Sequence, residues 1–131
     1  MAMNISFPGG LRVDAEFRGH VIKTDQVPKA GGDGSAPEPF SLFLASIGTC
    51  AGIFVLEFCR ARGISTEGIS LVQSHKVDPV DRSLAAVNIE IRVPPNFPEK
   101  YHAALVRAAD QCPVKRKIID PPEFNIQTIV T

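Results

Sequence analysis

The chain has 131 residues, which is enough for one domain with its own core, so we expect a single domain over residues 1–131. Its 14 basic and 14 acidic residues cancel, so it lacks the excess positive charge that phosphate binding requires, and we expect no nucleic-acid partner. Three cysteines are too few for a disulfide-stapled secreted domain, and the polar start Met1-Ala2-Met3-Asn4 lacks the pattern of a secretion signal, so we expect a reducing, cytoplasmic location.

The N-terminal residues predict a β-hairpin. From Leu11 to Phe17, apolar residues alternate with charged ones, which is the period of a half-buried strand. Arg18-Gly19 predicts a turn into a second strand, His20–Thr24. The glycine- and proline-rich residues 31–39 predict a loop inside the domain.

Residues 39–62 predict a long helix, with Pro39 in its first turn and Gly63 as a left-handed stop. From Pro39 to Leu56 the chain carries no charge, and this stretch of 18 residues is near the lower limit for a membrane span. Several small or polar residues interrupt it. We therefore expect no membrane span, but a central helix that a sheet or another subunit encloses.

The remaining chain predicts two strands, at residues 69–75 and 87–93, joined by a turn at Asp78-Pro79. A second helix opens near Phe97 and is broken by Pro113, after which a short helical turn follows. A final strand is expected over residues 124–130. The predicted order is ββαββαβ, an α+β fold in which helices pack on antiparallel sheet.

Cys50 lies at the middle of the predicted long helix, among the small residues Gly48, Thr49, Ala51 and Gly52. These neighbours allow a substrate or another backbone to approach closely. An apolar setting alone raises the pKa of a thiol and leaves it inert, so a reactive Cys50 requires a nearby cation. Without such a cation, Cys50 is a small core residue.

Cys112 directly precedes Pro113, where a new helical turn is predicted, so it lies at or near the N-cap of that turn. Free backbone N–H groups and the basic residues 115–117 favour a thiolate there, although a purely structural cysteine fits the position equally well. Cys59 follows Cys50 by nine positions, which places it on the opposite helix face. We expect Cys59 to serve packing.

The sequence predicts neither a metal site nor a cofactor. His20, His75 and His102 lie on three separate predicted elements, and no paired Cys or His spacing is present. No glycine-rich loop with a phosphate-binding lysine follows a strand, which argues against a nucleotide site.

Two segments together resemble a known family. Residues 36–50 (APEPFSLFLASIGTC) resemble the segment that leads to the first active cysteine of the OsmC/Ohr proteins. Residues 108–114 (AADQCPV) resemble the second-cysteine motif of that family. The separation of the two segments and the predicted element order agree as well, so the resemblance covers nearly the whole chain.

The resemblance implies an intertwined homodimer, with two long helices between sheets and a thiol site at the subunit interface. It also implies reduction of organic hydroperoxides, in which the Cys50 thiolate becomes a sulfenic acid and Cys112 condenses with it to a disulfide. A dithiol then reduces the disulfide. Arg18, after the first predicted strand, corresponds to the family arginine beside the thiolate, so Cys50, Cys112 and Arg18 are the candidate catalytic residues.

The sequence departs from the peroxidase members at one position. Those members carry a glutamate before the first cysteine that holds the arginine, whereas Phe40 and Ser41 stand here. Two alternatives therefore stay open. One is an OsmC-like thiol protein that senses redox state or binds a reactive sulfur species or an electrophile. The other is a non-enzymatic dimer that binds a small apolar ligand, with the cysteines as packing residues.

Overall fold

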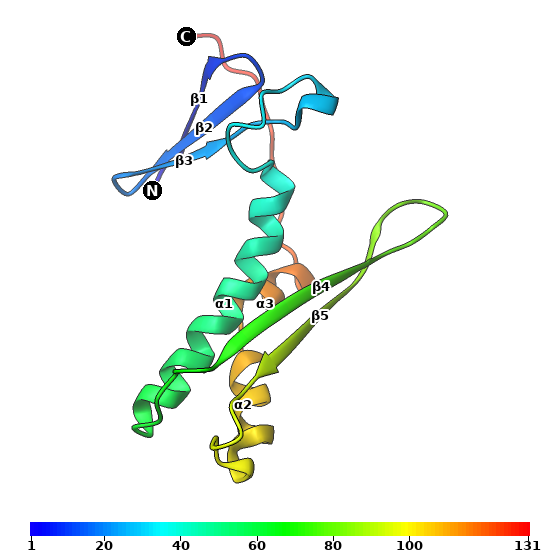
Figure 1. The fold of residues 1–131 in the computed structure, drawn as a ribbon. Helices are drawn as coiled ribbons and strands as arrows, with labels where there is room; N and C mark the ends of the chain where they lie inside the picture. The colour runs from blue at the N-terminus through cyan, green and yellow to red at the C-terminus, as the bar shows by residue number, and fades with distance from the viewer. The chain divides into compact units, whose positions relative to one another are not determined.

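The computed structural model describes all residues from 1 to 131, and the chain divides within its longest helix into two compact units, Met1–Ala45 and Ser46–Thr131 (Figure 1). The elements follow one another in the order β1 (Asn4–Gly9), β2 (Arg12–Phe17), β3 (His20–Thr24), a 3-10 turn (Pro28–Ala30), α1 (Pro39–Ala61), β4 (Ser70–Val77), β5 (Leu84–Arg92), a 3-10 turn (Glu99–Tyr101), α2 (His102–Ala109) and α3 (Pro113–Ile119).

The first unit contains an antiparallel sheet with the strand order β1-β2-β3. Phe17 pairs with His20, so only two residues connect β2 to β3. Both of them are left-handed, Arg18 at φ 50° and Gly19 at φ 79°. This geometry matches the right-handed twist of paired strands. The hairpin and its turn were predicted, and the prediction is confirmed.

β1 was not predicted from the sequence. It pairs with β2 through Ile5 and Ala15, but the register shifts between Ser6 and Gly9, around Pro8. Proline has no N–H for the ladder. Ile5 is also 55% exposed, so the strand carries no buried face that a period-two pattern would reveal.

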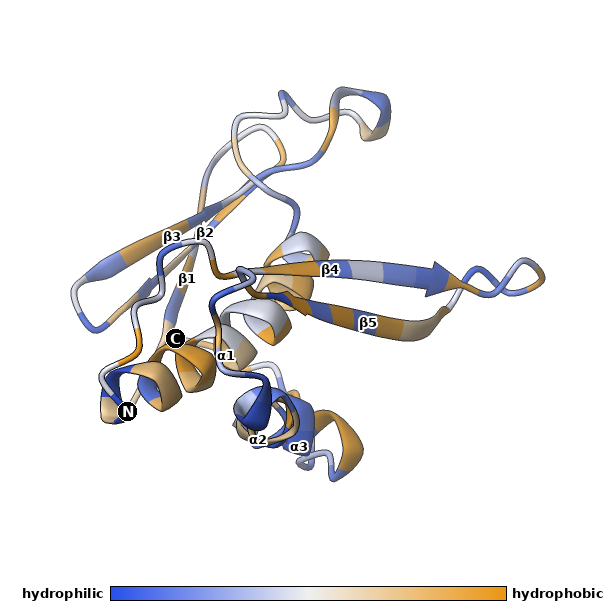
Figure 2. Ribbon diagram, turned by 60° about the horizontal axis from the view of Figure 1, so that its bottom comes forward, coloured by the Kyte–Doolittle hydropathy of each residue, from blue (hydrophilic) through white to orange (hydrophobic).

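The second unit is built on the Ser46–Ala61 part of α1, on which the antiparallel hairpin β4–β5 and the helix α2 pack (Figure 2). The orange ribbon of α1 and β5 in Figure 2 shows the apolar composition of both elements. As predicted, α1 begins at Pro39 and stops before Gly63, which is left-handed at φ 65°. The core of the second unit is formed by residues of α1, α2 and the segment before α2: Val55, Phe58, Cys59, Phe97 and Leu105.

α1 is apolar over 23 residues and is long enough, by length and composition alone, to cross a membrane. Only 22% of its most apolar window is buried in the single chain. Ile53, for example, is 45% exposed. The enclosure predicted for this helix is therefore incomplete within one copy of the chain.

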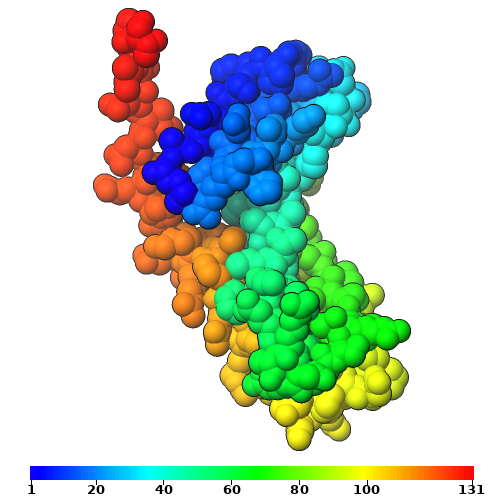
Figure 3. Space-filling view, turned by 90° about the vertical axis from the view of Figure 1, so that its left-hand side faces the viewer, coloured from blue at the N-terminus to red at the C-terminus, as the bar shows by residue number.

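For the single chain, the final strand predicted over residues 124–130 is wrong. The end of the chain forms no regular element and projects as a narrow red arm in Figure 3. Phe124 is 81% exposed and Ile126 is 96% exposed. A strand needs a hydrogen-bonded neighbour, and no strand of this chain pairs with the segment. The order is βββαββαα rather than ββαββαβ, while the α+β class with antiparallel sheets and a long helix is confirmed.

The loop between β3 and α1 is tied to a buried carboxylate. Asp25, only 1% exposed, accepts hydrogen bonds from the backbone N–H of Gln26 at 2.7 Å and of Ser35 at 3.0 Å. It also accepts one from the Ser35 hydroxyl at 2.6 Å. These bonds, chiefly the one from the Ser35 hydroxyl, lower the pKa of Asp25 from 3.8 to about 2. Asp25 therefore holds the loop as an ionised carboxylate.

We predict an acid-dependent loss of stability through Asp25. Because its folded pKa lies below the unfolded value, its contribution is fully present above pH 3.8 and is lost as the pH falls toward 2. Urea unfolding between pH 5 and pH 2 should show this slope in the wild type and a shallower slope in Asp25→Asn. The exposed carboxylate variant Glu16→Gln is the control. Equal slopes for wild type and Asp25→Asn would contradict the assignment.

Candidate functional site

The middle of α1 carries Cys50 in a run of small residues, and one of them lies against a side chain of β4. A Cβ atom at Gly48 would overlap the Oε1 atom of Gln73 on β4. A Cβ atom at Gly52 would meet nothing within 4 Å. Gly48 therefore leaves room for the end of the Gln73 side chain near Cys50, whereas Gly52 makes no such contact.

Cys112 is the N-cap residue of α3, as predicted. Its sulfur accepts a hydrogen bond from the backbone N–H of Lys115 at 3.5 Å, and Pro113 occupies the first helical position. Proline favours this position because the N–H that it lacks would have no partner there. Cys112 is only 2% exposed. The local sequence Cys-Pro thus fixes the orientation of the second thiol.

The structure brings Cys50 and Cys112 together although they lie on separate helices. The Cys112 side chain forms a hydrogen bond with the Cys50 thiol, and both cysteines are free rather than disulfide-bonded. Cys50 also interacts with the backbone N–H of Val114. The two first available N–H groups of α3 are therefore directed at two different sulfurs, Val114 at Cys50 and Lys115 at Cys112.

The pKa of the Cys50 thiol is raised above its ordinary value. Burial is the largest cause, followed by the hydrogen bond that the protonated Cys50 thiol donates to the Cys112 side chain, while the Val114 N–H acts in the opposite direction. No cationic side chain is among the groups that shift it. The positive charge expected beside Cys50 therefore does not act on it from within residues 46–131.

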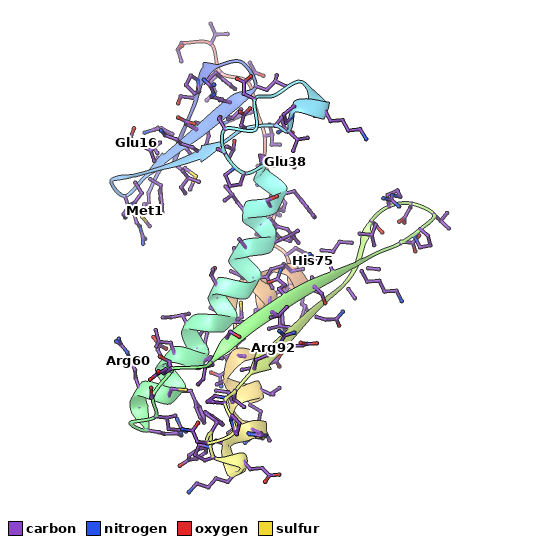
Figure 4. The ribbon with its side chains drawn as sticks, viewed as in Figure 1. Met1, Glu16, Glu38, Arg60, His75 and Arg92 are labelled. Carbon is purple, nitrogen blue, oxygen red and sulfur yellow. The ribbon has the colours of Figure 1, made fainter.

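Two of the three basic residues after Cys112 are paired with acids. Lys115 contacts the carboxylate of Asp110, and the Lys117 ammonium lies 3.9 Å from the Asp120 carboxylate. Figure 4 labels two arginines of this unit, Arg60 and Arg92. Arg60 lies at the C-terminal end of α1, and Arg92 lies on β5. Arg92 forms an ion pair with Glu90 on the same strand.

The third candidate residue, Arg18, belongs to the first unit. It lies in the β2–β3 turn, and its Nε atom is 3.2 Å from the Met1 sulfur. Its guanidinium also lies over the Phe17 ring, 5.1 Å from the ring centroid. A role for Arg18 beside the thiols stays a prediction.

Cys59 is a core residue, as expected from its helix face. It is fully buried and packs with Val55, Phe58 and Leu105. Burial raises the pKa of its thiol, which keeps it protonated.

A cavity of about 350 Å³ adjoins Cys112, and the sequence did not predict which residues line it. Its volume is in the range of small-molecule sites. It lies where residues of α1, β5, α2 and α3 meet: Ile47, Ala51, Val87, Ile89, Ile91, Val106, Ala109, Asp110, Cys112 and Lys115. The only sequence signal for this cavity was the alternation of apolar and polar residues along β5, because it gives the strand one apolar face. No group of three or more His, Cys, Asp or Glu side chains is arranged to hold a metal ion.

Solved structures share this fold at low sequence identity. A protein of Psychrobacter arcticus 273-4, named for osmotic stress induction and a detoxification response, matches with a TM-score of 0.74 and 22% identity, over 89% of this chain and 87% of that one. An organic hydroperoxide resistance protein OsmC of Legionella pneumophila matches with a TM-score of 0.57 and 18% identity, over 90% and 89%. An OsmC-like protein of Mycoplasma pneumoniae matches with a TM-score of 0.62 and 15% identity, over 92% and 89%.

No curated protein matches the chain in sequence. The sequence pattern of the OsmC-like proteins, however, matches residues 32–127, which include both cysteines of the thiol pair. The matched range runs from the loop before α1 to residue 127, so it covers every element of the second unit. The chain therefore belongs to the OsmC-like protein family.

Proposed function

We propose that this protein reduces organic hydroperoxides with the thiols of Cys50 and Cys112. The observation that carries the proposal is the contact between these two free thiols, each of which also has a backbone N–H partner. The name of the Legionella relative supports the same substrate class. Because the cysteines are free, we propose the cytoplasm as the compartment.

The proposed reaction has three steps. The Cys50 thiolate attacks the O–O bond of the hydroperoxide, becomes a sulfenic acid and, with one proton, releases an alcohol. The Cys112 thiol then condenses with the sulfenic acid, which forms the disulfide and releases water. A dithiol reduces the disulfide and returns both thiols. We assign the attack to Cys50 because it is partly exposed, whereas Cys112 is buried.

The attack requires a thiolate, and the raised pKa of Cys50 opposes its formation. We propose that Arg18 supplies the missing positive charge. No carboxylate stands at the position of the family glutamate, since Phe40 and Ser41 occupy it. Arg18 would therefore act without the carboxylate that holds the arginine in the peroxidase members.

A thiol switch is the second candidate function. It is favoured by the raised pKa of Cys50 and by the absence of a cation acting on it within residues 46–131. Such a protein forms the Cys50–Cys112 disulfide reversibly but turns over hydroperoxide slowly. The rate of turnover distinguishes the two functions.

We further propose that the protein works as a homodimer. Only 22% of the most apolar window of α1 is buried in one chain. The segment 124–130 has the period-two pattern of a strand, with Phe124 and Ile126 on one face, and has no strand partner. A second copy would provide both the cover for α1 and the sheet edge for this segment.

The first prediction for this function concerns the thiol pair. With tert-butyl or cumene hydroperoxide and a dithiol, the wild type should consume substrate, and Cys50→Ser should show no turnover. Cys112→Ser should complete the first oxidation and then stop, with sulfenic or sulfinic acid at Cys50 detected by mass spectrometry. Cys59→Ala is the control and should keep turnover. Full activity in Cys50→Ser would refute the proposed nucleophile.

The second prediction concerns Arg18. Arg18→Ala should lower kcat/KM by roughly a hundredfold, which is typical for loss of one electrostatic group at a reacting centre. The pH at which Cys50 alkylation reaches half its maximal rate should also rise, because a cation stabilises the thiolate. Arg82→Ala is a matched control, since Arg82 is also left-handed, at φ 64°. Equal kinetics in both variants would exclude Arg18.

The third prediction concerns assembly. Sedimentation should show a dimer for the wild type and weaker association for Ile126→Lys, because a charge would disrupt the apolar face of the added strand. Gln127→Lys places the same charge on the other face and should leave the dimer intact. A monomeric wild type would contradict the proposed dimer.

A further inference from the structure

The sheet of the first unit has a polar face and an apolar face. Two rows of paired residues cross β1, β2 and β3: Ser6, Asp14 and Lys23 form one row, and Ile5, Ala15 and Ile22 form the other. Successive side chains of a strand point to opposite faces, so the two rows lie on opposite sides of the sheet. Both isoleucines are exposed in one chain. A second copy that buries the apolar face would therefore leave the polar face open.

A cavity of about 310 Å³ lies at the polar face. This volume is at the lower end of the range of small-molecule sites. Three charged residues of its lining share this face, because they alternate along β2 or stand opposite it on β3: Arg12, Asp14 and Lys23. The other lining residues are Pro8, Thr24, Ser35 and Ala36. The loop between β3 and α1 thus contributes one wall.

Hydrogen bonds hold this wall in place. The Ser35 hydroxyl accepts a hydrogen bond from the Arg12 Nε atom at 3.2 Å, and the Arg12 Nη2 atom donates to the Asp33 carboxylate at 3.0 Å. Within the loop, a Cβ atom at Gly32 would overlap the backbone oxygen of Gln26, so the backbone is closely packed there. The loop wall and the Arg12 guanidinium are therefore positioned before a ligand arrives.

The cavity also contains two charges without a counter-ion. Asp14 and Lys23 stand directly opposite each other on β2 and β3, yet neither forms an ion pair within the chain. Arg12, by contrast, is paired with Asp33. An anion in the cavity would be repelled by the Asp14 carboxylate, and a cation would be repelled by the Lys23 ammonium. A molecule that carries both charges gains a partner for each of them.

We propose that this cavity binds a small zwitterion of the α-amino acid class. Its carboxylate pairs with the Lys23 ammonium, and its ammonium pairs with the Asp14 carboxylate. A short aliphatic side chain lies against Pro8 and Ala36. The site uses neither thiol, so it goes beyond the proposed peroxidase function and does not depend on it.

The first experiment compares three ligands of matched shape on the wild-type full chain. L-leucine carries both charges, isocaproate lacks the ammonium, and isoamylamine lacks the carboxylate. Amide chemical shifts in NMR titrations should move saturably with leucine, chiefly at the residues that line the cavity. Both analogues should bind about fivefold more weakly, because each loses one charged contact that is partly exposed to solvent. No saturable shift with leucine, or an analogue that binds as tightly as leucine, would overturn the proposal.

The second experiment assigns each charge to its residue. Asp14→Asn and Lys23→Gln should each weaken leucine binding about fivefold. Asp14→Asn should also bind isocaproate more tightly than the wild type does, and Lys23→Gln should do the same for isoamylamine, since a repelling charge is removed. Glu16→Gln is the control, because Glu16 shares the face with Asp14 but does not line the cavity. Affinities in the two site variants that match those of Glu16→Gln would contradict the proposed site.

Discussion

The thiol pair depends on the proline that opens α3. Pro113 has no N–H, so the first backbone donors of the helix are those of Val114 and Lys115, and each contacts a different cysteine. Cys112 is held as the cap of its own helix, while Cys50 is reached from the middle of another helix. One short turn of chain thus orients two thiols that lie far apart in the sequence. The adjoining cavity and the disulfide chemistry both depend on this arrangement.

Burial has opposite effects on the two halves of the proposed reaction. It keeps Cys112 away from water and close to Cys50, which favours disulfide formation once one sulfur has been oxidised. It also raises the pKa of Cys50 and so disfavours the attacking thiolate. Lys115, the lysine closest to Cys112 in sequence, forms an ion pair with Asp110 and does not act on the Cys50 thiol. Residues 46–131 therefore contain both thiols but no cationic side chain that acts on Cys50.

The features that were predicted correctly are local ones. The Arg18-Gly19 turn and the cap at Cys112 follow from backbone preferences over two to four residues. β1 was missed because Pro8 and its exposed side chains hide the strand pattern. The strand predicted at 124–130 failed because a pattern does not supply a neighbour. The meeting of two thiols was suggested only by the family resemblance, and the residues that line the cavity could not be predicted, because four separate elements enclose it.

The close approach at Gly48 has a consequence for what position 48 can carry. The side-chain amide of Gln73 on β4 lies against the bare backbone of α1 at that point. The same amide contacts the ring of His75 at 2.7 Å. A side chain at position 48 would displace this flexible amide and so disturb a polar contact on β4, two positions away from Cys50 on the helix.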